Sequence, residues 1–150
     1  MKKFIQNKLK EQKGLTLIEL LAVIVIIAII AAIAIPAIGN IIENSRHNAA
    51  KADVQNVMSS ASLYFTETGS ADNDEADLTV AESGTLSGDL ANFVDDPGNV
   101  TTATVTKLAG GNEITATVVT DQGTYQFTDL TNNELSSMSA DDIEEVFTAS

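Results

Sequence analysis

The chain has 150 residues and a formal net charge of −13 at neutral pH, and it contains no cysteine. This length allows one small globular domain next to a long apolar segment. The absence of cysteine excludes disulfides, thiol nucleophiles and thiolate metal sites. The excess of carboxylates repels the phosphates of nucleic acids and so disfavours their direct binding.

The first fourteen residues form a basic leader that ends at Gly14. The leader carries five lysines and one glutamate, a net charge of +4, so its removal takes the formal charge from −13 to −17. Positive charge before an apolar run and negative charge after it predict a cytoplasmic leader and an extracellular remainder. A cut after Gly14 would create a new α-amino group on Leu15.

An apolar run follows the leader, with no charged side chain from Leu20 to Ile42. It exceeds the roughly 20 residues that a helix needs to cross a hydrocarbon core, so residues 15–42 are predicted to span the membrane, with Pro36 kinking the helix. Glu19 stands near its start, where a carboxylate costs about 2.5 kcal/mol or more toward the bilayer centre and therefore needs a partner. The amine on Leu15 of a neighbouring copy is the best candidate.

The string GLTLIEL from Gly14 to Leu20, with Pro36 closing the run, resembles the type III signal of type IV prepilins and pseudopilins. This resemblance implies that a membrane peptidase cuts after Gly14 and N-methylates Leu15. It also implies that Leu15, Thr16, Glu19 and Pro36 take part in assembling a helical filament. The alternative of an ordinary signal anchor, with Glu19 merely interfacial, leaves Gly14 and Glu19 unexplained, and a plain secretory peptide would have an apolar region of about 7–15 residues.

The function that the resemblance implies is that of a structural subunit of a type IV pilus-like surface filament, with a role in adhesion or motility. Its partners would be other copies of itself, the prepilin peptidase, the assembly platform and minor pilins, and the membrane for the precursor. A pseudopilin of a type II secretion or competence DNA-uptake machine is the alternative within the family. A membrane-anchored binding domain that never polymerises is the alternative from another class. The absence of cysteine weakly favours a Gram-positive source, because many Gram-negative relatives carry a disulfide.

Residues 43–150 are the predicted extracellular head. The helix is expected to continue to about Thr66 and to stop at Gly69. Apolar residues recur at helical spacing through its second half and predict one face packed on the head: Ala50, Val54, Val57, Met58, Ala61 and Phe65.

The rest of the head is predicted to be a small antiparallel sheet of about three strands. Residues 68–99 are interpreted as a long connecting loop with a possible short helix through Leu86, Leu90, Phe93 and Val94. Strands rich in threonine and valine are expected at 100–108, 113–120 and 123–128, joined at hairpin spacing. Ile114, Ala116, Val118, Tyr125 and Phe127 are predicted to face the helix. The fold class is therefore α+β, the long helix and small sheet of a pilin fold.

Three further features carry predictions about chemistry. Ser139 is expected to cap a short acidic helix, with Asp142 in its first turn and with Ile143, Val146 and Phe147 on one face. The cluster Asp72, Asp74, Glu75 and Asp77 has oxygen ligands that could hold Ca²⁺, but it lacks the glycine and distal glutamate of an EF-hand, so a solvated turn is favoured and no metal or cofactor is expected. The single histidine, His47, has no nucleophile motif beside it and is predicted to face solvent, and enzymatic activity has no support.

Overall fold

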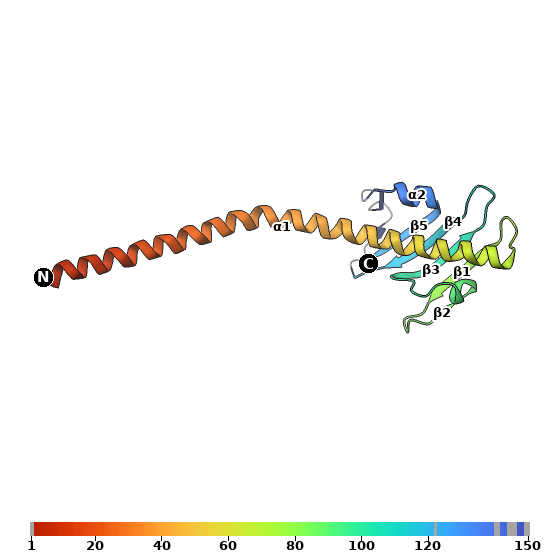
Figure 1. Ribbon diagram of the computed structural model, residues 1–150, viewed down its shortest axis with the longest axis horizontal. Helices are drawn as coiled ribbons and strands as arrows, with labels where there is room; N and C mark the ends of the chain where they lie inside the picture. Colours follow the sequence, from red (N-terminus) through yellow and green to blue (C-terminus); the bar gives the residue numbers. More distant parts are fainter. Residues whose placement is uncertain (1, 122, 140–141, 144–146, 149–150) are drawn as a thin grey trace. The chain divides into compact units, whose positions relative to one another are not determined.

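The computed structural model describes residues 2–121, 123–139, 142–143 and 147–148, with side chains described from residue 17 to residue 121, from 123 to 139 and at 142–143. Its internal contacts divide the chain into two compact units, Met1–Glu43 and Asn44–Ser150. The helix α1, Lys2–Thr68, contributes to both units and contains Pro36 (Figure 1). The backbone of the leader, residues 2–14, is thus already helical, where the sequence placed the helix start at Leu15.

The end of α1 is set by Gly69. This residue has φ of 67°, a left-handed conformation that costs a glycine nothing but strains other residues. The backbone N–H of Ser70 then donates to the carbonyl of Phe65, 3.3 Å away, which is the long hydrogen bond of a Schellman motif. The predicted stop at Gly69 is confirmed.

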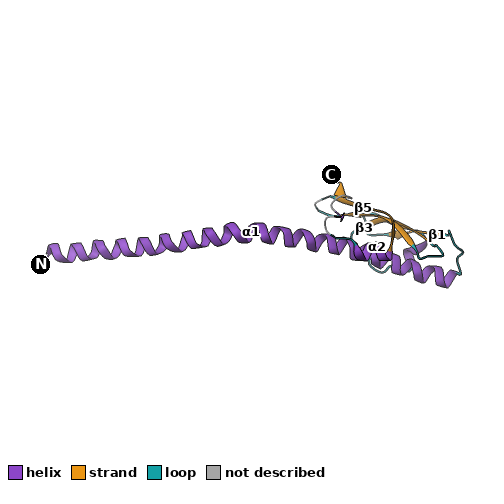
Figure 2. Cartoon of the chain, turned by 90° about the horizontal axis from the view of Figure 1, so that it is seen from above, coloured by secondary structure: helices purple, strands orange, loops and turns teal. Residues whose placement is uncertain are grey.

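In the second unit, one face of α1 is buried at every predicted position. The buried helix residues are Ala50, Val54, Val57, Met58, Ala61 and Phe65. They belong to a single hydrophobic cluster with side chains from the sheet, which is stacked on this part of α1 (Figure 2). Burial of each larger aliphatic side chain contributes about 1.5–3 kcal/mol, so this stripe holds the head on the helix.

The described residues form one antiparallel sheet in the order β2-β1-β3-β4-β5-β6. Its strands are β1 Glu75–Val80, β2 Leu86–Ser87, β3 Val100–Thr106, β4 Glu113–Val119, β5 Thr124–Thr131 and β6 Phe147–Thr148. The inward side chains of β4 and β5, from Ile114 to Phe127, are buried as predicted. Two short helices have their full bounds within the described residues, the 3-10 helix η1 at Asp89–Asn92 and α2 at Asn132–Ser137, and residues 142–143 are also helical.

The α+β fold class is confirmed, but the prediction of about three strands is wrong. Strand β1 lies in the segment interpreted as a loop, and it pairs with β3 along its length. Ala76 and Leu78 point into the core and alternate with the outward Glu75 and Asp77. Because acidic residues are depleted in strands, Glu75 and Asp77 hid the alternation of buried and exposed residues that marks a strand. The burial of Leu78 and the pairing with β3 outweigh the low strand propensity of these acidic residues.

The possible short helix through Leu86, Leu90, Phe93 and Val94 is only partly present. Leu86 belongs to β2, which pairs with β1, and the helical turn is confined to η1. Gly88 separates the two elements with φ of 97°, which no continuous helix allows. Leu90 and Val94 are nevertheless buried in the core cluster. Both apolar residues do pack on the core, but the helix predicted to carry them is wrong.

The predicted cap at Ser139 has its hydrogen bonds. The backbone N–H and the hydroxyl of Ser139 both donate to Asp142 Oδ2, at 2.7 and 2.8 Å. Ile143 is buried, whereas Val146 lies outside the described residues. Phe147 belongs to β6 and pairs with Tyr125, so its predicted place in a helix is wrong.

The helix α2 was missed by the sequence analysis, although it carries a complete capping box. Glu134 Oε2 accepts from the backbone N–H and the hydroxyl of Thr131 at 2.8 and 2.7 Å, and the N–H of Glu134 donates back to the Thr131 hydroxyl. The backbone bond and then the hydroxyl bond from Thr131 lower the pKa of Glu134. This arrangement stabilises the ionised carboxylate at the start of the helix.

We predict that α2 loosens in acid. Because folding lowers the pKa of Glu134, its stabilisation is complete above the ordinary glutamate pKa and is lost as the pH falls through the lowered value. Amide NMR shifts of α2 should therefore titrate at acid pH. A Glu134→Gln variant, which has no charge to lose, should not show that titration; if it titrates in the same way, the capping box is not its cause.

A tight turn before β3 is attached to α1 through Asp53. The backbone N–H of Asn99 donates to Asp53 Oδ2 at 2.9 Å, and Asn56 Nδ2 donates to the Asp96 carbonyl at 3.0 Å. Gly98 adopts φ of 60°, and a Cβ on it would lie 2.3 Å from the Asp53 carboxyl group. The turn can approach the helix this closely because residue 98 has no side chain.

We predict that Gly98→Ala destabilises the head by about 2–3 kcal/mol, from a left-handed alanine and the loss of the Asp53 hydrogen bond. Gly84→Ala is the matched control, because Gly84 has φ of 78° but an added Cβ would meet nothing within 4 Å. Urea unfolding of the full chain in detergent can be followed by tyrosine emission. Equal losses in the two variants would show that the Asp53 contact contributes nothing.

Candidate functional site

The first unit presents an unusual surface, an apolar helix whose large side chains are all uncovered in the part where side chains are described, residues 17–43. From Leu17 to Ile42 its large aliphatic side chains are 48–71% exposed. Consecutive residues from Val23 to Ile27 are all apolar, and at 100° per residue they point in every direction around the helix. A helix that is apolar all round is stable only inside a membrane or among other apolar surfaces.

The length and composition of this helix suit a membrane span. Within the described residues, one helical stretch, Leu17–Thr68, is long and apolar enough to cross a bilayer, with a mean hydropathy of 3.2 in its most apolar window. The proline at position 36 lacks an N–H, so the carbonyl one turn before it has no intrahelical donor. Such a point is tolerated where neighbouring helices or water satisfy the carbonyl.

Glu19 is the single ionisable residue inside this apolar surface. Its side chain is exposed, and among the described side chains it has no ion-pair partner. Residues 15 and 19 are one helical turn apart on α1, so the end of a chain cut after Gly14 would lie on the face of Glu19.

The prokaryotic N-terminal methylation motif, the type IV pilin signal, matches residues 9–35 of this chain. The match begins inside the basic leader, includes Gly14 and Glu19, and ends one residue before Pro36. The chain therefore carries the signal of a type IV pilin-like or pseudopilin precursor. No curated protein and no solved structure matches the chain.

His47 is buried, so the prediction of a solvent-facing residue is wrong. It is 5% exposed, and its ring meets that of Tyr125 edge to face, with centroids 5.6 Å apart. No described group hydrogen-bonds its Nδ1. The helical pattern placed His47 in a polar stretch, but β5 brings Tyr125 over it, a contact that local sequence does not encode.

The acidic residues 72–77 are not brought together as ligands. Asp74 Oδ2 accepts the backbone N–H of Ala71 at 2.7 Å, and Asp77 Oδ1 accepts the hydroxyl of Thr104 at 2.8 Å. Asp72 precedes the strand, and Glu75 lies in its first position. Across the described part of the chain, no three carboxylates or histidines are grouped so as to hold a metal ion.

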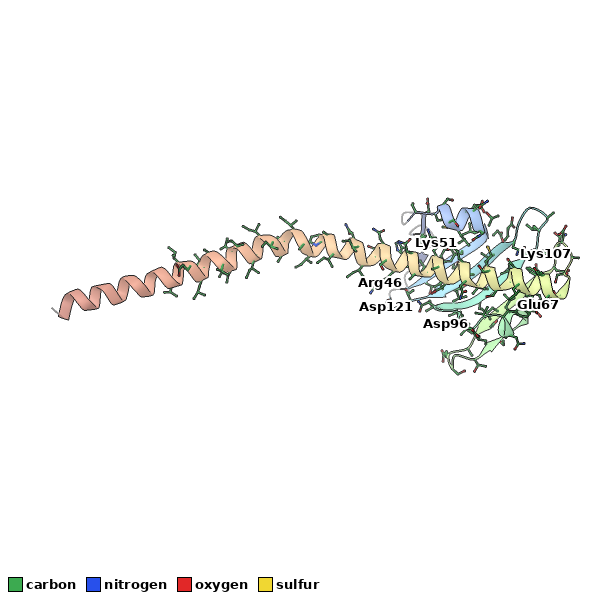
Figure 3. The ribbon with its side chains drawn as sticks, viewed as in Figure 1. Arg46, Lys51, Glu67, Asp96, Lys107 and Asp121 are labelled. Carbon is green, nitrogen blue, oxygen red and sulfur yellow. The ribbon has the colours of Figure 1, made fainter. Side chains whose placement is uncertain are left out.

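The three basic side chains beyond the leader all make contacts within the head. Arg46 pairs with Asp121 at 3.3 Å, Lys51 Nζ donates to the Met138 carbonyl at 3.2 Å, and Lys107 donates to the Ser70 carbonyl. Figure 3 places Lys107 away from Arg46 and Lys51. The three cations therefore form no basic patch on which a phosphate backbone could lie.

Proposed function

We propose that this protein is a structural subunit of a type IV pilus-like surface filament that polymerises through residues 15–42. The observation that carries the proposal is the uncovered apolar helix with one carboxylate near its start, preceded by Gly14 within the matched motif. In a single subunit, membrane lipid would surround this helix, which is apolar on all sides. The same surface suits packing against copies of itself in a filament.

The subunit would occupy these two environments, the membrane and the filament, one after the other. The precursor is a single-pass protein of the cytoplasmic membrane, with the leader inside and residues 43–150 outside. A prepilin peptidase cuts after Gly14 and methylates the amine of Leu15, and an assembly platform with minor pilins adds the subunit to the filament. Thr16 and Pro36 belong to the helix that packs in the filament core. The chain performs no catalysis in this account, and a Gram-positive source stays a prediction from the missing cysteines.

The covered core and the acidic charge of the head support a role outside the membrane. Its core is complete within residues 44–150, because the stripe on α1 is covered by the sheet. After removal of the leader the chain carries a formal charge of −17, which favours solubility of the exposed heads. Adhesion and motility are the surface roles we propose for such a filament.

Negative-stain microscopy of material sheared from cells tests the proposal. An antibody raised against the head should label thin filaments along their length, and a strain lacking the protein should show no label. Label confined to short structures that appear only when secretion or DNA uptake is induced would assign the chain to the pseudopilins. Antigen that stays entirely in the membrane fraction would contradict polymerisation and favour an anchored binding domain.

A further inference from the structure

A small groove opens on the head, and all of its lining residues belong to the second unit. It has a volume of about 150 Å³ and is formed by α1, the turn between β3 and β4, and the start of α2. The residues that line it are Met58, Ser59, Ser62, Gly110, Gly111, Asn112, Thr131, Asn132 and Asn133. None of them was selected by the sequence analysis as a binding residue.

The lining of this groove is uncharged, since none of its side chains is ionisable. The head as a whole is strongly acidic, so an uncharged concave surface stands apart from its surroundings. An anion would find no cation in this lining, and a cation would find no carboxylate. Met58, which is 4% exposed, is its one large apolar side chain, so an apolar ligand would leave the polar groups around it unpaired.

Hydrogen-bonding capacity remains unused on three carboxamides. Asn112 Nδ2 donates to Ser62 Oγ at 3.0 Å, which leaves the amide oxygen of Asn112 free to accept. Asn132 and Asn133 are exposed at the start of α2, and among the described residues the side-chain hydrogen bond made to this pair uses the backbone carbonyl of Asn132, not a carboxamide. Each carboxamide both donates and accepts, which suits a ligand whose groups do the same.

The groove also has open backbone. A Cβ built on Gly110 or on Gly111 would meet nothing within 4 Å, so the chain in this turn is not covered by neighbouring side chains. A hollow of about 150 Å³ has the size that accommodates a single six-membered ring. The groove is therefore small, uncharged and lined by groups that both donate and accept hydrogen bonds. These properties together suit an uncharged ring that bears several hydroxyl groups.

We propose that this groove binds one neutral sugar residue, with the carboxamides of Asn112, Asn132 and Asn133 bonding its hydroxyl groups and Met58 contacting its ring. A site of this size with few direct contacts corresponds to a Kd on the order of 1 mM for a free monosaccharide. Many copies along a filament would raise the avidity for a surface that displays the same sugar. The binding itself does not depend on polymerisation, so it can be tested on the subunit.

The test is NMR of the isotope-labelled full chain in a detergent that has no sugar headgroup. Three ring probes of equal size separate the chemistry: glucose, glucuronate and glucosamine, which are neutral, anionic and cationic at neutral pH. A capped neutral dipeptide serves as the peptide probe. We expect glucose or another neutral hexose to shift the side-chain amide signals of Asn112, Asn132 and Asn133 in a saturable way, with the charged sugars and the dipeptide at least tenfold weaker.

The decisive variant is the double substitution Asn132→Ala and Asn133→Ala. Alanine favours helix at these positions, and the Asn132 carbonyl that accepts from Ser136 Oγ is retained, so α2 should stay folded. Gln126→Ala removes an exposed carboxamide from the middle of β5 and is the matched control. The double variant should weaken sugar binding at least tenfold, while the control should bind like the parent chain.

Several outcomes would overturn the proposal. These are the absence of saturable shifts with any neutral hexose, equal affinity for the charged sugars, stronger binding of the dipeptide, and undiminished binding in a folded double variant. Shifts confined to residues outside the groove would also contradict it. None of these outcomes bears on filament formation, so the two proposals fail separately.

Discussion

Glu19→Gln is expected to abolish or sharply reduce surface filaments while the protein stays at normal abundance in the membrane. In a lone subunit the carboxylate can remain near the membrane interface, so its replacement by a neutral side chain should slightly favour insertion. In a filament it would be flanked by the ammonium group on Leu15 of a neighbouring copy. Removal of one partner leaves the other charge buried and unpaired, which costs about 3–5 kcal/mol.

The measurement uses a strain that lacks the native protein and expresses the variant. Membrane abundance is determined by immunoblot, and surface filaments are counted by microscopy. Glu43→Gln is the matched control, because it neutralises an exposed carboxylate just beyond the apolar run, and it should leave filaments intact. Glu19→Val should behave like Glu19→Gln, since both lack the charge.

Two results would contradict the electrostatic docking of Glu19. Normal filaments from Glu19→Gln at normal abundance would make this residue an incidental interfacial charge. Loss of the protein from the membrane would instead assign Glu19 to insertion or stability. The comparison with Glu43→Gln separates both results from a general effect of charge on expression.

Gly14→Val is expected to leave the leader attached and to prevent the release of a mature chain. The physical reason is the absence of a side chain at the cleaved bond, the feature on which the resemblance to prepilins rests. The uncut chain would keep five lysines before the span and would have no free amine at Leu15 to meet Glu19 of a neighbour. Filaments should therefore be lost together with processing.

Intact mass spectrometry of the membrane protein distinguishes the two forms, because the mature chain lacks fourteen residues and carries a methylated Leu15. Gly39→Ala is the control, since a Cβ at Gly39 would meet nothing within 4 Å and the site lies far from the cut in sequence. This control should be processed normally. A mature chain that starts at methylated Leu15 in the Gly14→Val strain would contradict the proposed cleavage by a prepilin peptidase.

The spacing of residues along the chain was enough to predict the signal and most of the long helix. Gly14, Glu19 and the apolar run are neighbours in sequence, so their relation needs no tertiary contact, and the methylation motif covers them. The stripe on α1 and the strands β3 to β5 were likewise predictable, because each shows its own period of apolar residues. Gly69 ended the helix as expected because a left-handed residue is a local requirement.

Only the tertiary structure decided the features that join distant segments. Strand β1 has an acidic sequence and forms because Leu78 is buried and β3 supplies its hydrogen bonds. His47 is buried because Tyr125 arrives over it, and the groove exists because three separate segments meet. Local propensity and periodicity predict the secondary structure of a segment and the face that it buries. They do not predict which side chains from distant segments will contact that face.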